Sequence, residues 1–113
     1  MANVPITIHE GDKEVLDFAL YDRNGDPITV DDVTAAVFVA VFGAVVIECS
    51  LGDGISTAVV GGVLVVTVSI SVAKTETITS TEGAYQMRVT RGSIGPETIA
   101  EGRAAGIRKI EGD

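Results

Sequence analysis

The chain has 113 residues, the length of one domain, and we expect a single domain over residues 1–113. Its 16 acidic and 8 basic side chains give a net charge of −8, which argues against nucleic acid as a partner because phosphates would be repelled. A hydrophobic content of 46% excludes intrinsic disorder. A single cysteine excludes an internal disulfide, and no apolar run reaches the roughly 18 residues of a membrane span.

The charge is unevenly distributed. Residues 1–53 contain ten acids and two bases, whereas the remainder contains six of each. Solubility explains an acidic half, and binding to a basic partner surface is the alternative. The N-terminus lacks the basic and apolar parts of a signal peptide, so we expect the protein to be made in the cytoplasm.

The kind of apolar residue indicates β-structure. Val, Ile, Ala and Thr dominate, aromatic residues make up only 4%, and there is no Trp. Branched side chains of this kind suit a pleated, half-buried surface. Turn-forming residues recur about every 10 residues with β-rich runs between them, which is typical of a sandwich or barrel. We expect an all-β fold of about eight strands.

In the first half of the chain, the apolar pattern alternates clearly in one segment, where Leu16, Phe18 and Leu20 share a face. Asn24-Gly25 follows and predicts a tight reversal, because both residues tolerate the positive φ that hairpin turns require. The predicted strands of this half span residues 4–9, 14–21, 28–33, 35–42 and 44–49.

In the second half, Leu64, Val66 and Val68 begin the longest β-rich run. The pattern breaks at Ala73 and Lys74, and we expect at most a short helical turn near 72–79. The predicted strands of this half span residues 55–60, 63–72, 84–91, 97–101 and 104–110.

The segment from residue 35 to 47 is apolar on both faces, unlike a strand with one face in water. It needs a second cover, supplied either by another subunit or by the chain itself. We predict a subunit interface in a homo-oligomer, and burial of both faces within one domain is the alternative. The predicted interface residues are Val37, Phe38, Val39, Val41, Phe42, Val45 and Ile47.

The residues that could support catalysis are few. The only histidine, His9, lies near the end of a predicted strand, and no serine-nucleophile motif accompanies it. Cys49 ends an apolar run without a basic neighbour in sequence, which favours a buried, unreactive thiol. One His and one Cys cannot complete a zinc site without carboxylates. We therefore expect no enzyme activity, no catalytic residue, no cofactor and no small-molecule substrate.

Calcium is the one metal for which the sequence offers ligands. Asp22, Asn24 and Asp26 place oxygen atoms close together in sequence. An EF-hand loop, however, has glycine at its sixth position and glutamate at its twelfth, and this segment has neither. A hairpin turn explains the same residues, so we expect no bound metal and keep calcium as the alternative.

Glycan binding is a further alternative, because carbohydrate sites use exposed aromatic platforms. Phe18 fits a predicted core face, and Phe38 and Phe42 belong to the segment that is apolar on both faces. Tyr21 and Tyr85 would therefore have to form that platform.

The order of turns and strands along the chain carries a resemblance. The segments involved are Gly11-Asp12, then Asp22-Arg23-Asn24-Gly25-Asp26-Pro27-Ile28, Asp32-Val33-Thr34, Glu82-Gly83-Ala84-Tyr85 and Thr98-Ile99-Ala100-Glu101-Gly102. This order resembles the small Ig-like β-sandwich domains of tailed-bacteriophage virions and is similar to the N-terminal domain of the baseplate upper protein family. The resemblance implies an Ig-like antiparallel sandwich that packs around a tail or head symmetry axis, as trimers or hexamers.

The resemblance also implies a function. Relatives that bind receptors continue into a fibre or a second domain, whereas this sequence stops at Asp113. We therefore expect a structural component of the virion, in the tail, baseplate, connector or decoration, assembled in the host cytoplasm. Its expected partners are its own copies and other virion proteins, with no nucleic acid and no membrane. A glycan- or protein-binding module is the alternative.

Overall fold

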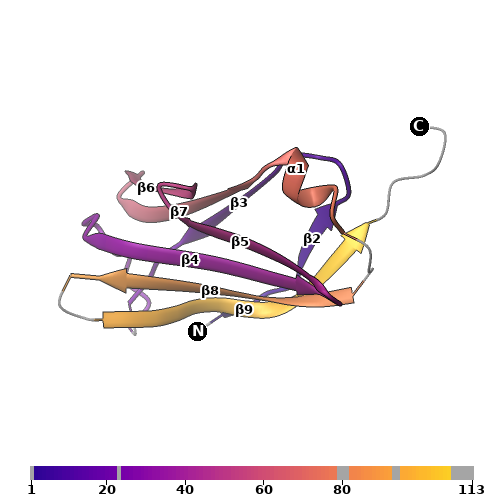
Figure 1. Ribbon diagram of the computed structural model, residues 1–113. Coiled ribbons are helices and arrows are strands. Elements are labelled where there is room, and N and C mark those ends of the chain that lie inside the picture. The colour runs from indigo at the N-terminus through magenta and orange to yellow at the C-terminus, as the bar shows by residue number, and fades with distance from the viewer. Residues whose placement is uncertain (1, 23, 79–81, 93–94, 108–113) are drawn as a thin grey trace.

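Strands account for most of the computed structural model, which describes residues 2–22, 24–78, 82–92 and 95–107 (Figure 1). The molecule is elongated, with principal extents of 47 × 21 × 21 Å. The strands are β1 (Ala2–Asn3), β2 (Ile6–His9), β3 (Glu14–Ala19), β4 (Val33–Phe42), β5 (Val45–Leu51), β6 (Gly54–Val60), β7 (Val63–Ile70), β8 (Glu82–Arg91) and β9 (Gly95–Ile107). A four-residue helix, α1 (Val72–Thr75), connects β7 to β8. The predicted all-β fold and short helical turn are confirmed.

The strands form one sheet that curls into two facing layers. Its order is β1-β9-β8-β4-β5-β6-β7-β3, and β2 also pairs with β9. In Figure 1 the long strands β4, β8 and β9 make one layer, and β7 and β3 belong to the other. The layers join where β5 pairs with β6 over two residue pairs. No pairing joins β3 to β1 or β9 among the described residues, so the curled sheet stays open on that side.

Apart from shifts of one or two residues at strand ends, the strands differ from the predicted ones at three places. Residues 28–32 form no strand, and the hairpin before them is held by one bridge between Tyr21 and Pro27. The first strand is broken at Pro5, which has no N–H to donate to a ladder. The strands expected at 97–101 and 104–110 are one strand, because Gly102 stays paired with Tyr85 in the ladder. Residues 108–110 lie outside the described residues.

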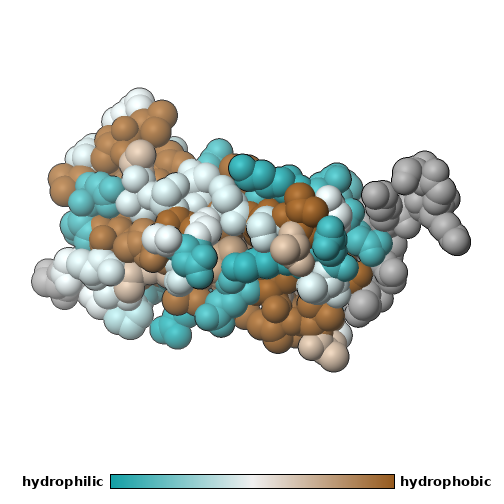
Figure 2. All heavy atoms as spheres, turned by 45° about the horizontal axis from the view of Figure 1, so that its top comes forward, coloured by the Kyte–Doolittle hydropathy of each residue, from teal (hydrophilic) through white to brown (hydrophobic). Residues whose placement is uncertain are grey.

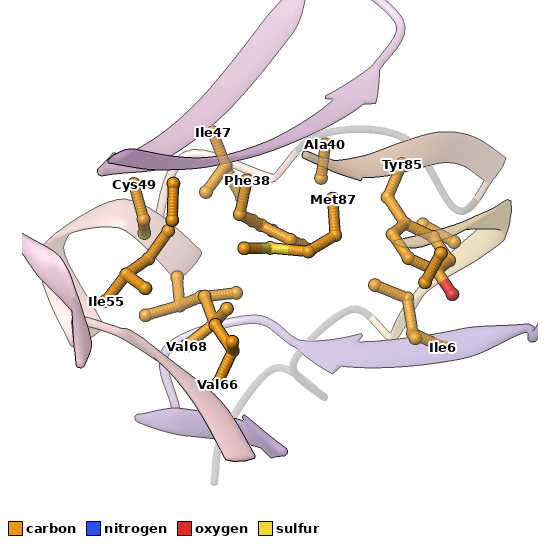
Figure 3. Close-up of a cluster of buried hydrophobic side chains, with 14 of the residues drawn as sticks. Ile6, Phe38, Ala40, Ile47, Cys49, Ile55, Val66, Val68, Tyr85 and Met87 are labelled. Atoms are coloured by element: carbon orange, nitrogen blue, oxygen red, sulfur yellow. The ribbon is translucent and has the colours of Figure 1, made fainter. Parts of the chain in front are cut away.

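The core lies between the two layers and follows the period-two alternation of the strands. Along β7 every second residue is fully buried, from Leu64 to Ile70. Phe38 and Met87 project from the other layer and are also fully buried. Figure 3 shows the two sets of side chains pointing toward one another. Each such side chain contributes about 1.5–3 kcal/mol of hydrophobic stabilisation.

Tyr85 ties the N-terminal segment to this core. It is 3% exposed, and its ring lies 5.9 Å from that of Phe38 and 6.5 Å from that of Phe18, measured between centroids. Its hydroxyl donates to the carbonyl oxygen of Val4, between β1 and β2. A buried ring with a satisfied hydroxyl explains why the short N-terminal strands stay in place against β9.

The approach of β8 to β4 requires a glycine at position 83. A Cβ there would overlap the carbonyl oxygen of Val41 and lie 2.8 Å from Cδ1 of Phe42. We expect Gly83→Ala to lower the free energy of unfolding by about 2 kcal/mol, because neither a backbone atom nor a buried ring can move aside. Urea denaturation measures the change, with Ala84→Ser, at the exposed neighbouring position, as the control. Equal stability of the two variants would contradict the close approach.

Candidate interaction surface

The outward side of β4 carries the most regular apolar surface of its layer. Val37 and Val41 are 38% and 39% exposed, Val39 between them is partly buried, and Val46 on β5 is 59% exposed. Val46 lies directly across from Val41 in the β4–β5 ladder. We call Val37, Val39, Val41 and Val46 the outer valine face. Apolar side chains grouped on one sheet face are typical of a surface that another protein covers.

Polar side chains of opposite sign border the outer valine face. Val39 pairs with Glu48 on β5 and with Gln86 on β8, whereas Val37 pairs with Arg88 on β8. The β5 side is therefore acidic and the β8 side basic. On the face of the molecule that Figure 2 shows, hydrophobic and hydrophilic surface lie side by side. A partner must match charges as well as cover valines.

The predicted interface was wrong for three residues. Phe38 and Phe42 are 0% exposed and Ile47 is 1% exposed, because they point into the core between the layers. Val45 also packs partly against that core. Val37, Val39 and Val41 remain available on the outside. The alternative, burial of both faces within one domain, is also wrong, because one face of β4 is left at the surface.

Sequence analysis missed Val46. The alternation along β5 places Val46 and Glu48 outward and Ile47 and Cys49 inward. The sequence signal for this residue is the period-two alternation within β5 itself, which groups Val46 with Glu48.

His9 contacts a carboxylate rather than a nucleophile. Its Nδ1 lies 2.7 Å from Oε1 of Glu14, and the same oxygen accepts the backbone N–H of His9 at 2.9 Å. Asp12 is close by, and the ligand atoms of the three residues lie within 4.8 Å of one another. The hydrogen bonds explain the approach of His9 to Glu14 without an ion.

Cys49 is a buried thiol with an unexpected neighbour. It is 1% exposed, in agreement with the prediction of a small buried side chain. Burial raises the pKa of the Cys49 thiol, and Lys74 on α1, whose Nζ lies 3.8 Å from Sγ, only partly opposes this rise. The lysine ammonium also donates to the carbonyl oxygen of Glu48 at 2.7 Å. A thiol held in its protonated form is a poor nucleophile.

Asp22 of the predicted calcium site binds the backbone of the turn. Oδ1 of Asp22 accepts the N–H groups of Asn24 and Asp26 at 2.9 and 3.0 Å. Outside this turn, Asp31 accepts the hydroxyl of Thr57 at 2.7 Å, and Asp32 forms an ion pair with Arg91 at 2.9 Å. Each of these carboxylates has a structural hydrogen-bonding role. A hairpin turn therefore accounts for the position of the Asp22 carboxylate without a bound ion.

The aromatic platform expected for glycan binding is not formed. Tyr85 lies in the core, and Tyr21 is 55% exposed on a different part of the molecule from the outer valine face. Tyr21 alone offers one aromatic ring for a sugar to stack on, so these two tyrosines do not form a shared platform.

Neither a protein-family model nor a curated protein matches this sequence. In the described part of the chain, no helix has the length and apolar character needed to cross a bilayer.

The raised pKa of Cys49 predicts a loss of stability in alkali. An unfolded thiol ionises near pH 8.5, whereas the folded thiol keeps its proton to higher pH, so ionisation stabilises the unfolded state first. We expect the free energy of unfolding to fall by up to about 1 kcal/mol between pH 7.5 and 9.5 through this group. Urea denaturation at both pH values measures the fall, which Cys49→Ala should reduce. An equal fall in the wild type and in Cys49→Ala would show that other titratable groups cause the loss of stability.

The role of Asp22 predicts how the turn responds to mutation and to calcium. Asp22→Ala should lower the free energy of unfolding by about 1 kcal/mol, because two backbone N–H groups lose their acceptor. Millimolar calcium should leave the melting temperature of the wild type unchanged. A rise in melting temperature that the variant does not show would instead establish a calcium site. Differential scanning calorimetry distinguishes the two outcomes.

Proposed function

We propose that this chain is a non-enzymatic structural protein of a tailed-bacteriophage virion, in the tail, baseplate, connector or decoration, assembled in the host cytoplasm. It acts by associating with its own copies and with other virion proteins. The observation that carries the association is the outer valine face, an exposed apolar stripe on a rigid sheet. The resemblance in the order of turns supports the virion as its location.

The Ig-like form of the sandwich is part of this proposal, and the strand order supports it. β3, β7 and β6 are neighbours in one layer, and β9, β8, β4 and β5 in the other. Immunoglobulin-type sandwiches have the order B-E-D in one sheet and G-F-C-C′ in the other, and the two orders correspond. The N-terminal strands β1 and β2 run parallel to β9, as an added strand beside G.

The charges beside the valines favour one geometry of self-association. A two-fold axis along β4 would place β5 of one copy over β8 of the next, so that Glu48 approaches the side that carries Arg88. An axis across the strands would place Glu48 over Glu48 of the second copy. The first arrangement pairs opposite charges around the buried valines. Each Å² of apolar surface covered contributes about 25 cal/mol.

Light scattering after size-exclusion chromatography tests the association. The wild type should form a dimer or larger oligomer at micromolar concentration. Val41→Lys should yield a monomer with an unchanged circular dichroism spectrum, because a charge would be buried in the contact. Val59→Lys is the matched control, since Val59 is 43% exposed on β6, away from this face. A wild type that is strictly monomeric would refute self-association through the outer valine face.

The virion assignment has an independent test. The genes that flank this one should encode tail or head proteins, and an antibody against the chain should label purified particles in electron micrographs. Particles without the chain would refute the assignment, whatever its oligomeric state.

A further inference from the structure

The open side of the curled sheet contains a groove. It has a volume of about 350 Å³ and lies between β3 on one side and β2 with β9 on the other. Apolar residues of both walls line it, among them Ile6, Leu16, Phe18 and Ile99. Leu16, Phe18 and Ile99 pack against the core but are only partly buried. The hydrophobic interior therefore continues to the surface at this place.

One wall of the groove is a strand edge with free backbone groups. The N–H of Leu20 donates to the carbonyl oxygen of Leu64 at 2.9 Å, which continues the register of β3 with β7. The residues of β3 at even-numbered positions, like Leu20, therefore form the hydrogen-bonded pairs of this ladder. Because such pairs alternate along antiparallel strands, Val15, Asp17 and Ala19 direct their N–H and C=O groups away from β7. No strand pairs with β3 on that side in the described ranges. An edge of this kind can accept a further strand.

The opposite wall is also incomplete. β9 pairs with β8 along its length, but β1 meets it only at Ala100 and Glu101, and β2 only from Ala104 onward. The ladder with β8 skips Ile99, so that a bulge lies where the groove begins. Bulges of this type redirect a side chain and are enriched beside binding sites. Both walls thus present strand edges and apolar side chains to one groove.

The charge of the groove indicates the chemistry of its occupant. The charged residues that line it are Asp17 and Glu97, both acidic and exposed. A second copy of β3 would bring its own Glu14 and Asp17 into the groove and be repelled. A segment with basic side chains would be attracted instead.

We propose that this groove binds an extended segment of a different protein, in which apolar side chains alternate with lysine or arginine. The segment adds as a strand to the edge of β3, its apolar side chains enter the groove, and its basic side chains meet Asp17 and Glu97. This proposal adds a binding site to the assembly role proposed above. It depends on that role only for the identity of the partner protein. The groove and the outer valine face belong to different surfaces, so one can fail without the other.

A synthetic peptide tests the groove directly. The probe is a nine-residue peptide in which valine alternates with lysine, and the control peptide has glutamate in place of lysine. Isothermal titration calorimetry should show binding of the lysine peptide at least about tenfold tighter than that of the glutamate peptide. Amide hydrogen exchange should slow at Val15, Asp17 and Ala19, whose N–H groups become paired.

Charge-reversal variants test whether Asp17 and Glu97 cause the preference for the lysine peptide. The double variant D17K/E97K should reverse the preference between the two peptides while the circular dichroism spectrum stays unchanged. The double variant D53K/E76K, with two exposed acids changed away from the groove and from the outer valine face, is the matched control and should keep the wild-type preference. Equal binding of both peptides, or binding without protection of the β3 amides, would overturn the proposal. The oligomeric state in the absence of peptide reports separately on the outer valine face.

Discussion

The structure depends on one constraint, the period-two alternation of a strand that is apolar on both faces. In β4 this alternation sends Phe38, Ala40 and Phe42 into the core, where each is fully buried. The residues between them, Val37, Val39 and Val41, must then point outward. The same alternation fills the interior and produces the exposed valines. A change of register by one residue would bury three valines and expose two phenylalanines, and the large loss of buried area opposes it.

Sequence reasoning succeeded where local pattern determines the structure. The alternation of β7, the hairpin turn at Asn24-Gly25 and the short helix after Ser71 are all set by neighbours along the chain. It failed where the answer depends on residues far apart. The proximity of Lys74 to Cys49 arises from the packing of α1 beside β5. The hydrogen bond of Tyr85 to Val4 likewise joins residues that are 81 positions apart in the sequence. Nor could the sequence show which face of β4 would be inside, because both faces have similar hydrophobicity.

Two surfaces with different properties follow from the way the sheet curls. The outer valine face lies on the outward side of a layer, where the proposed self-association would use side-chain contacts between oppositely charged borders. The groove lies at the open side of the sheet, where backbone edges are available and the acidic lining disfavours a copy of the same chain. Self-association and recruitment of another protein would therefore not compete for the same residues.

The N-terminal strands and the last strand run in the same direction. β1 pairs with β9 over two residue pairs and β2 over four, so that Ala2 lies beside Ala100 and His9 beside Ile107. A pull on the start of β1 and on the end of β9 therefore acts along the strands, and slides them past each other instead of peeling them apart. The interstrand hydrogen bonds bear such a shear load together rather than one after another. The domain is thus built to resist tension between its ends better than its short N-terminal strands alone would indicate.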